Sequence, residues 1–211
     1  MPRTVSNVKP GDEPHSAEFF DAMFRDDSDP WRFKSRWYEI RKRAVTLASL
    51  PRAKYTSGFE PGCANGELGA ALAGRCEHLL CSDGSALAVQ AASVRLAESA
   101  EVEVRQLWLP DQWPDEKFDL IVISELAYYL SDAQLHKLIV RAERSLNTNG
   151  TLLACHWRHP IPGCALRGDQ IHDALCLGLS VPHISTHLEQ DFRIDVWSRD
   201  GQSVAQREHL I

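Results

Sequence analysis

The amino-acid sequence predicts an α/β fold built on a mostly parallel sheet. From residue 55 onward, short apolar runs alternate with stretches of helical period, which is the pattern of successive βαβ units. The run 118–124 (Phe-Asp-Leu-Ile-Val-Ile-Ser) is almost continuously apolar, as expected of a central strand buried on both faces. The length of 211 residues suits one domain with short additions.

Composition excludes several classes of protein. Apolar residues make up 44% and charged residues 25% of the chain, which is ordinary for a globular protein and unlike a collagen, a disordered chain or a disulfide scaffold. The net charge of −6 argues against nucleic-acid binding, which requires clustered Lys and Arg. No apolar run approaches ~18 residues, so we expect no membrane span, and the N-terminus lacks the apolar region of a secretory signal.

Two helices are predicted before the sheet begins. Residues 1–16 are rich in proline and charge and are interpreted as a flexible leader, followed by a helical region over 17–52. The first helix, Ala17–Phe24, is broken by residues 26–30. The second runs from about Arg36 to Leu50 and stops at Pro51. Its apolar residues, spaced three or four apart, predict the face that packs on the core: Trp37, Ile40, Ala44, Leu47 and Ala48.

The remaining elements follow in alternation. We expect strands at 55–60, 79–82, 102–107, 118–124, 151–156, 183–187 and 192–197, the last two paired antiparallel, and helices at 68–73, 85–97, 132–146 and 171–179. Ser85 is a suitable N-cap for the helix that follows it, and Asn149-Gly150 is expected to form the turn after the helix 132–146. Residues 53–200 are thus the expected core, and 201–211 a C-terminal tail.

The six cysteines form no C-x-x-C pair. They are interpreted as buried or incidental thiols in a reducing cytoplasm, and no metal site is expected.

The stretch Glu60-Pro61-Gly62-Cys63-Ala64-Asn65-Gly66 carries the clearest functional signal. It lies between a predicted strand and a predicted helix, where glycines allow the backbone to approach a ligand and the free N–H groups of the helix favour an anionic group. Asp83 follows Gly62 by 21 residues, just past the second strand, where a carboxylate can accept both hydrogen bonds of a ribose diol.

The alternative interpretation is a tight strand-to-helix turn that binds nothing. The motif departs from G-x-G-x-x-G because it has one glycine fewer and an acidic residue two positions before the first glycine. This favours a cofactor with a single nucleoside over a nicotinamide dinucleotide.

Over residues 36–197 the chain resembles the class I S-adenosylmethionine-dependent methyltransferases, and within them the NodS-like family. The first motif is shared by many methyltransferases, whereas the co-occurrence of the others is more specific. The stretches that carry the resemblance are D-P-W-R-F (29–33), W-Y-E-I-R-K-R (37–43), E-P-G-C-A-N-G (60–66), D-Q-W-P (111–114), F-D-L-I-V-I-S-E-L-A-Y-Y-L (118–130) and H-W-R-H-P (156–160). The resemblance implies a Rossmann-like fold with a seven-stranded sheet and an N-terminal helical lid over 17–52.

The resemblance also implies a set of residues around S-adenosylmethionine. They are Trp31, Arg36, Glu60, Gly62, Cys63, Ala64, Gly66, Asp83, Gly84, Leu107, Trp108, Ser124, Glu125 and Leu126. The chain departs from the family pattern at 105–109, where an acidic residue usually contacts the adenine. Here Trp108 is expected to stack on the adenine, or else simply to belong to the core with Leu107.

Two residues are expected to act on the acceptor. Glu125 follows the central strand, where it could orient or deprotonate an amine, and His156 ends the next strand, with a pKa suited to proton transfer near neutrality. The structural alternatives are a glutamate that caps the next helix and a buried histidine. Acceptor binding is expected from Tyr128, Trp157, Arg158 and His159.

The function expected from the resemblance is N-methylation of a small or saccharide amine, as in deacetylated chitooligosaccharides, with S-adenosylhomocysteine as product. The enzyme is expected in the cytoplasm as a monomer or weak dimer, without nucleic-acid or membrane partners. Three alternatives remain open at this point: an O-methyltransferase acting on a small metabolite, a nicotinamide-dependent oxidoreductase, and a non-catalytic cofactor-binding module.

Overall fold

The computed structural model describes residues 15–211, so residues 1–14 of the expected leader lie outside the described part of the chain. It contains one seven-stranded sheet in the order β3-β2-β1-β4-β5-β7-β6. The strands β1 to β5 run parallel, and β7 is antiparallel to both β5 and β6. The strands are β1 (Tyr55–Pro61), β2 (Cys76–Asp83), β3 (Val102–Gln106), β4 (Phe118–Ser124), β5 (Leu146–Trp157), β6 (His183–Leu188) and β7 (Phe192–Ser198). The predicted α/β class, the seven strands and the final antiparallel pair are therefore confirmed.

Helices join several of these strands, and two of them begin at serine caps. The Ser85 side chain accepts a hydrogen bond from the amide of Ala88, which confirms it as the N-cap of α4, and Ser131 with Gln134 forms a capping box that starts α5. The helices are α1 (Ala17–Asp26), α2 (Trp37–Ala48), α3 (Glu67–Ala73), α4 (Ala86–Arg95), α5 (Asp132–Ser145), α6 (Gly168–Gly178) and α7 (Val204–Arg207), with a 3₁₀ turn at Ala127–Tyr129. No helix within residues 15–211 is long and apolar enough to cross a membrane.

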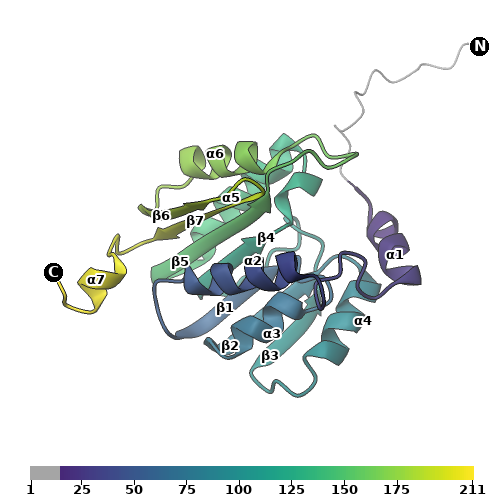
Figure 1. Cartoon of the computed structure of the whole chain (residues 1–211), viewed down its shortest axis with the longest axis horizontal. Coiled ribbons are helices and arrows are strands. Elements are labelled where there is room, and N and C mark those ends of the chain that lie inside the picture. The colour runs from purple at the N-terminus through teal and green to yellow at the C-terminus, as the bar shows by residue number, and fades with distance from the viewer. Residues whose placement is uncertain (1–14) are drawn as a thin grey trace, which may run out of the picture.

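The sheet separates two apolar clusters, one on each face. One cluster contains Leu135, Leu138 and Ile139 of α5 with Ile171 and Leu175 of α6. The other contains Leu72 of α3, Ala92 of α4 and Leu96, which directly follows α4. Successive residues of β4 alternate between the two, so this strand is buried on both faces as its sequence predicts. Figure 1 shows the sheet between these helices, with α1 beside α4 and the C-terminal α7 on the opposite side of the view.

The expected turn at Asn149-Gly150 is wrong. The strand β5 begins at Leu146, the residue directly after α5, and residues 149 and 150 belong to it. The pairing between β4 and β5 shifts from Phe118↔Leu146 to Leu120↔Thr151, so the extra residues form an irregularity in the strand. A turn-type dipeptide is thus accommodated by a bulge.

The predicted packing face of α2 is also wrong. Trp37 is 71% exposed, whereas the buried residues of the helix are Glu39, Lys42 and Thr46. These residues are spaced three and four apart and share one face. The helix turns this polar face toward the carboxyl ends of the strands, where charged side chains lie, while Val45 makes apolar contact with the core.

The loop between α1 and α2 is tied to the glycine turn through Asn65, whose Nδ2 donates to the carbonyl oxygen of Ser28 (3.4 Å) and to the Asp29 carboxylate. Asp29 accepts hydrogen bonds from the amides of Phe33 (2.7 Å) and Lys34 (3.1 Å) of its own loop and from Asn65 Nδ2 (2.9 Å). Helix α1 is held separately, because Ser85 Oγ donates to Asp21 Oδ1 at 2.5 Å. These contacts bring the segment before the sheet over the carboxyl ends of β1 and β2.

Candidate functional site

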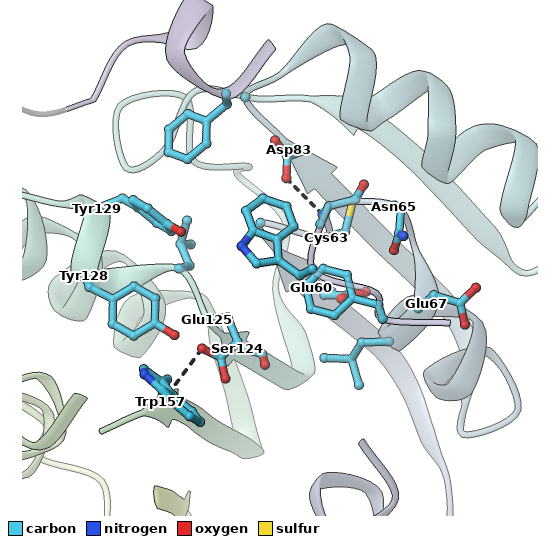
Figure 2. Close-up of a pocket in the computed structure, with 18 of the residues that line it drawn as sticks. Glu60, Cys63, Asn65, Glu67, Asp83, Ser124, Glu125, Tyr128, Tyr129 and Trp157 are labelled. Carbon is cyan, nitrogen blue, oxygen red and sulfur yellow. Dashed lines mark hydrogen bonds between the residues drawn. The ribbon is translucent and has the colours of Figure 1, made fainter. Parts of the chain in front are cut away.

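A pocket of about 500 Å³ lies at the carboxyl ends of β1 to β5, below α1, α2 and the loop that joins them. This volume is within the usual range for small-molecule sites, ~300–1,000 Å³, and the position is where open α/β sheets bind ligands. Figure 2 shows Glu60, Asp83, Glu125, Tyr128 and Trp157 arranged around it.

The glycine turn after β1 forms one wall. The amides of Gly62 and Cys63 both donate to the carbonyl oxygen of Ser82 on β2 (2.7 and 2.8 Å). Gly62 has φ +74°, and a Cβ there would meet Leu126 at 3.0 Å, so both conformation and space require glycine. Gly66 also has positive φ but lies outside the pocket, where its missing Cβ allows Ala92 to pack closely. Gly66 therefore supports the turn, and the expectation that it lines the pocket is wrong.

Asp83 lies at the end of β2 and is held by backbone amides. Its Oδ2 accepts from the amide of Ala64 and its Oδ1 from the amide of Ser85, both at 3.0 Å. Figure 2 shows the first of these bonds, which joins the carboxylate to the glycine turn. Burial raises the pKa of Asp83, although the amide hydrogen bonds oppose this. The carboxylate is thus fixed in the pocket wall with each oxygen still able to accept another hydrogen bond.

Glu60, at the end of β1, is only 2% exposed and lines the same wall. Its Oε2 accepts from the thiol of Cys81 at 3.3 Å. Burial raises the pKa of Glu60 to about 8, and the nearby Asp83 adds to the shift. A buried acid without a cation beside it favours the protonated form at neutral pH.

Trp108 closes the pocket beyond β3. A Cβ on Gly84 would collide with its ring, so the close approach of Trp108 requires glycine at this position. Leu107 also lines the pocket, and no acidic side chain between residues 105 and 109 replaces the acid of the family pattern.

The loop before α2 provides an aromatic cover and a free cation. Trp31 stacks on Phe33 (5.5 Å between centroids) and meets Phe24 edge to face (5.6 Å). Arg36 also lines the pocket and forms no salt bridge with the acidic side chains that the structure describes. Its guanidinium is therefore available to a ligand carboxylate.

Glu125 follows β4 in a left-handed conformation with φ +55°, which is uncommon for a residue with a side chain. Its Oε1 lies 2.6 Å from Lys42 Nζ, and its Oε2 accepts from the amide of Trp157 at 3.3 Å. Lys42 also contacts Glu39 Oε2 at 3.0 Å. Burial raises the pKa of Glu125, and the Lys42 ammonium opposes that shift.

His156 does not reach the pocket, so the position expected for it beside the acceptor is wrong. It is fully buried, and its Nε2 accepts from the amide of Ala127 at 3.3 Å. Its Nδ1 faces His172 Nε2 at 3.2 Å, and His172 Nδ1 in turn faces Asp195 Oδ2 at 2.7 Å. Burial and the neighbouring His172 hold the pKa of His156 well below its ordinary value. The histidine is thus a neutral part of a buried network behind the pocket.

Arg158 and His159 were also expected in the pocket, but neither of them lines it. Arg158 forms two hydrogen bonds with Asp169 (2.9 and 3.0 Å) and His159 contacts Asp191 at 2.8 Å. These salt bridges lie beyond the end of β5, where the chain turns away. The other expected residues do line the pocket: Trp31, Arg36, Glu60, Gly62, Cys63, Ala64, Asp83, Gly84, Leu107, Trp108, Ser124, Glu125, Leu126, Tyr128 and Trp157.

Sequence analysis missed Lys42, Glu39 and Asn65, which line the pocket as well. Lys42 and Glu39 stand in a charged stretch that is typical of a solvent-facing helix, and nothing local marks them as buried. Asn65 lies inside the glycine turn, so its position was a usable signal. Its Oδ1 is buried and has no hydrogen-bond partner among the described residues.

Outside the pocket, Cys176, His183 and Asp195 bring possible metal ligands within 4.8 Å of one another. Asp195 also accepts a hydrogen bond from Arg193 Nε at 2.6 Å, and this positive charge opposes cation binding. All six cysteines are free thiols.

Comparison with known families and curated proteins adds the following findings. The family model described as Nodulation protein S (NodS) matches residues 20–169. Nodulation protein S of Rhizobium tropici is 30% identical over 127 residues, which are 59% of this chain and 53% of that protein. The protein of the same name from Sinorhizobium fredii is 33% identical over 110 residues, 49% of each chain. The chain thus spans about half the length of these curated relatives.

Solved structures show the same architecture. A crystal structure from Pseudomonas syringae, described as that of a candidate methyltransferase, is 52% identical, with a TM-score of 0.70 over 78% of this chain and all of that one. The N-methyltransferase NodS of Bradyrhizobium japonicum WM9, in complex with S-adenosylhomocysteine, has a TM-score of 0.78 over 86% of this chain and 97% of that one. At 23% identity, this second likeness concerns the fold alone.

Proposed function

Because the chain belongs to the Nodulation protein S (NodS) family, we propose that it is an S-adenosylmethionine-dependent methyltransferase that methylates an amine. The observation that carries the proposal is one pocket that joins the glycine turn and Asp83 to Glu125. The first two are the features expected around a nucleoside cofactor, and the third lies where an acceptor would meet it. S-adenosylhomocysteine would be the product.

The residues present fit this cofactor. Gly62 lines the pocket without a side chain of its own, and the orphaned Oδ1 of Asn65 needs a donor such as an ammonium group. Asp83 offers two carboxylate oxygens to a ribose diol, and Trp108 an apolar ring to an adenine. Arg36 supplies a positive charge for a carboxylate.

When bound, S-adenosylmethionine supplies a methyl group whose bond to sulfur breaks as the bond to the acceptor forms. The protein contributes chiefly by positioning, because alignment of reacting groups can provide ~7–11 kcal/mol of rate enhancement. Trp31 and Phe33 cover the pocket and limit the entry of water. Glu125 is placed to bind and deprotonate an ammonium.

We propose a small or saccharide amine as the acceptor. Trp157 offers a flat face for a sugar ring beside Glu125, whose carboxylate accepts from the Trp157 amide. The net charge of −6 also favours the approach of a cationic acceptor. We further propose a cytoplasmic location, which is supported by the free state of all six cysteines.

Isothermal calorimetry with S-adenosylhomocysteine tests the cofactor proposal on the full chain. We expect saturable binding, and the absence of both heat and thermal stabilisation would overturn it. A methyl-release assay over amino sugars, small amines and their hydroxyl analogues then tests the acceptor. Turnover of hydroxyl compounds alone would replace N-methylation with O-methylation, and a response to nicotinamide dinucleotides instead would indicate an oxidoreductase.

A further inference from the structure

Apolar packing does not explain why the polar face of α2 is buried. Glu39, Lys42 and Thr46 are all buried, and burying charged side chains is costly unless they are paired. Lys42 is paired twice, with Glu125 at 2.6 Å and with Glu39 at 3.0 Å. Two carboxylates thus share one ammonium at the acceptor end of the pocket, and the group is short of one positive charge.

Glu125 is held from several sides in this arrangement. Its amide donates to the carbonyl oxygen of Cys155, its two carboxylate oxygens contact Lys42 and the amide of Trp157, and its backbone is left-handed. Strained backbone of this kind persists where the surrounding structure fixes it, often at functional sites. Lys42 is the only side chain in the described part of the chain that forms a salt bridge with Glu125.

Two tyrosine hydroxyls near this carboxylate have no partner. The Oη atoms of Tyr38 and Tyr128 are buried and unbonded among residues 15–211, and both residues line the pocket with Glu125. Figure 2 shows the Tyr128 hydroxyl pointing toward Glu125. Tyr38 lines the same pocket, with its ring centroid 5.4 Å from that of Trp157 and 5.1 Å from Lys42 Nζ. A buried hydroxyl without a partner costs ~1–3 kcal/mol, so a polar ligand atom is its natural partner.

We propose that the Glu125 carboxylate and the hydroxyls of Tyr38 and Tyr128 hold the acceptor nitrogen, and that Lys42 is the positioning residue that fixes Glu125. This inference rests on the methyl-transfer function proposed above. An entering ammonium supplies the missing positive charge and donates its N–H groups to these oxygens. It then transfers one proton to Glu125, which leaves a neutral nitrogen with a lone pair; the proton passes from Glu125 to water after turnover.

The hydroxyls are tested by Tyr128→Phe and Tyr38→Phe, with Tyr55→Phe as the matched control. Tyr55 is also buried, but it lies at the amino end of β1, away from the pocket, with its hydroxyl beside Thr151 and the backbone of Arg52. We expect unfolding temperatures that are equal or higher in the two pocket variants, because each removes a hydroxyl that has no hydrogen-bond partner in the described part of the chain. We expect KM for an amine acceptor, with glucosamine as the first probe, to rise about tenfold in the two pocket variants only.

Binding without turnover gives a second measurement. The S-adenosylhomocysteine-loaded chain is titrated with the same amine, and the thermal shift that it causes should weaken in Tyr128→Phe but not in Tyr55→Phe. A loss of stability in Tyr128→Phe, or behaviour equal to that of Tyr55→Phe, would overturn the role of the hydroxyl. Failure of every amine in the panel to bind the loaded wild type would overturn the whole subsite. Neither result would affect S-adenosylhomocysteine binding, whose own absence would instead refute the proposed function.

Lys42 is tested by Lys42→Met and Lys42→Arg, with the exposed Lys54→Met as the control. Loss of the ammonium should move the acidic limb of the kcat/KM profile to higher pH, because Glu125 then binds its proton more tightly. Lys42→Arg should return the limb toward the wild-type position, which a merely structural lysine would not do. An unmoved limb in Lys42→Met would overturn the proposal. If Lys42→Met does not fold, Lys42→Gln takes its place, because it keeps a hydrogen-bond donor but lacks the charge. An unmoved limb in Lys42→Gln would then overturn the proposal.

Discussion

Lys42 and Glu125 lie 83 residues apart in the sequence, yet their charged atoms are 2.6 Å apart at the inner end of the pocket. Lys42 comes from the segment before the sheet and Glu125 from the tip of the central strand. The salt bridge therefore joins the two parts of the chain that enclose the pocket, and we expect its removal to lower stability.

Lys42→Met should destabilise the protein by about 3–5 kcal/mol, because it leaves Glu39 and Glu125 without their cation in a buried place. In the double variant Lys42→Met/Glu125→Gln, part of this loss should be recovered, since one uncompensated charge is gone. Urea unfolding of the four chains in this cycle measures the coupling. The exposed pair of Lys137 and Asp111 is the control, and Lys137→Met should cost under ~1 kcal/mol. Strict additivity of the two pocket substitutions would contradict the prediction.

Glu60 should make the stability of the ligand-free protein fall as pH rises from about 4.5 to about 8. Burial raises the pKa of Glu60 to about 8 in the folded chain, against the ordinary value of 4.5 in the unfolded chain. Within this window the folded chain holds a proton that the unfolded chain releases, so the stability present below pH 4.5 is lost as pH approaches 8. In Glu60→Gln this fall should be smaller, whereas the exposed Glu77→Gln should retain it. Equal pH profiles for wild type and Glu60→Gln, from urea unfolding, would show that Glu60 is already ionised.

Asp83→Asn should weaken S-adenosylhomocysteine binding by roughly 10- to 100-fold, because a charged acceptor of hydrogen bonds is replaced by a neutral amide with one acceptor oxygen. The change also removes an oxygen that holds the amide of Ala64 or Ser85. Calorimetry measures the dissociation constant, and circular dichroism at the same temperature separates binding from unfolding. Asp115→Asn, on an exposed loop, serves as the control. An unchanged dissociation constant would exclude Asp83 from the cofactor site.

Gly62→Ala should lower both stability and cofactor affinity. The residue has φ +74°, which costs about 1–2 kcal/mol for a residue with a side chain, and the new methyl group would press on Leu126. Gly74→Ala is the matched control, because Gly74 has φ −65° and a methyl group added there would meet no atom within 4 Å. That substitution should change stability by less than about 1 kcal/mol in either direction. Thermal unfolding of both variants gives the comparison, and an equal effect of the two would contradict the role of the turn.

The parts of the fold that the sequence could predict are those with local causes. The alternation of apolar runs and helical stretches predicts the sheet, and the continuous run 118–124 predicts its centre. The glycine turn and Asp83 were predictable for the same reason, since one motif places both at adjacent strand ends. Their assignment to a cofactor remains a proposal.

The parts that could not be predicted depend on contacts between distant residues. Nothing near His156 indicates that His172 and Asp195 complete its hydrogen bonds inside the core, and nothing near Arg158 shows that Asp169 binds it. The buried face of α2 was missed because its helical period was read from apolar residues alone. The buried face of this helix is polar. It is buried because Lys42 pairs with Glu125, which lies 83 residues away in the sequence.

The hydrogen bonds of Asp29 have a consequence for how the pocket could open. Two of them hold the shape of its own loop, through the amides of Phe33 and Lys34. The third ties the loop to Asn65, whose Nδ2 also donates to the carbonyl oxygen of Ser28 at 3.4 Å. Breaking these two bonds to Asn65 would leave the internal bonds of the loop intact, so the loop would move away as one preformed element instead of unravelling. Each round of ligand exchange would then require little reordering of the backbone, which keeps the entropic cost of closing the pocket low.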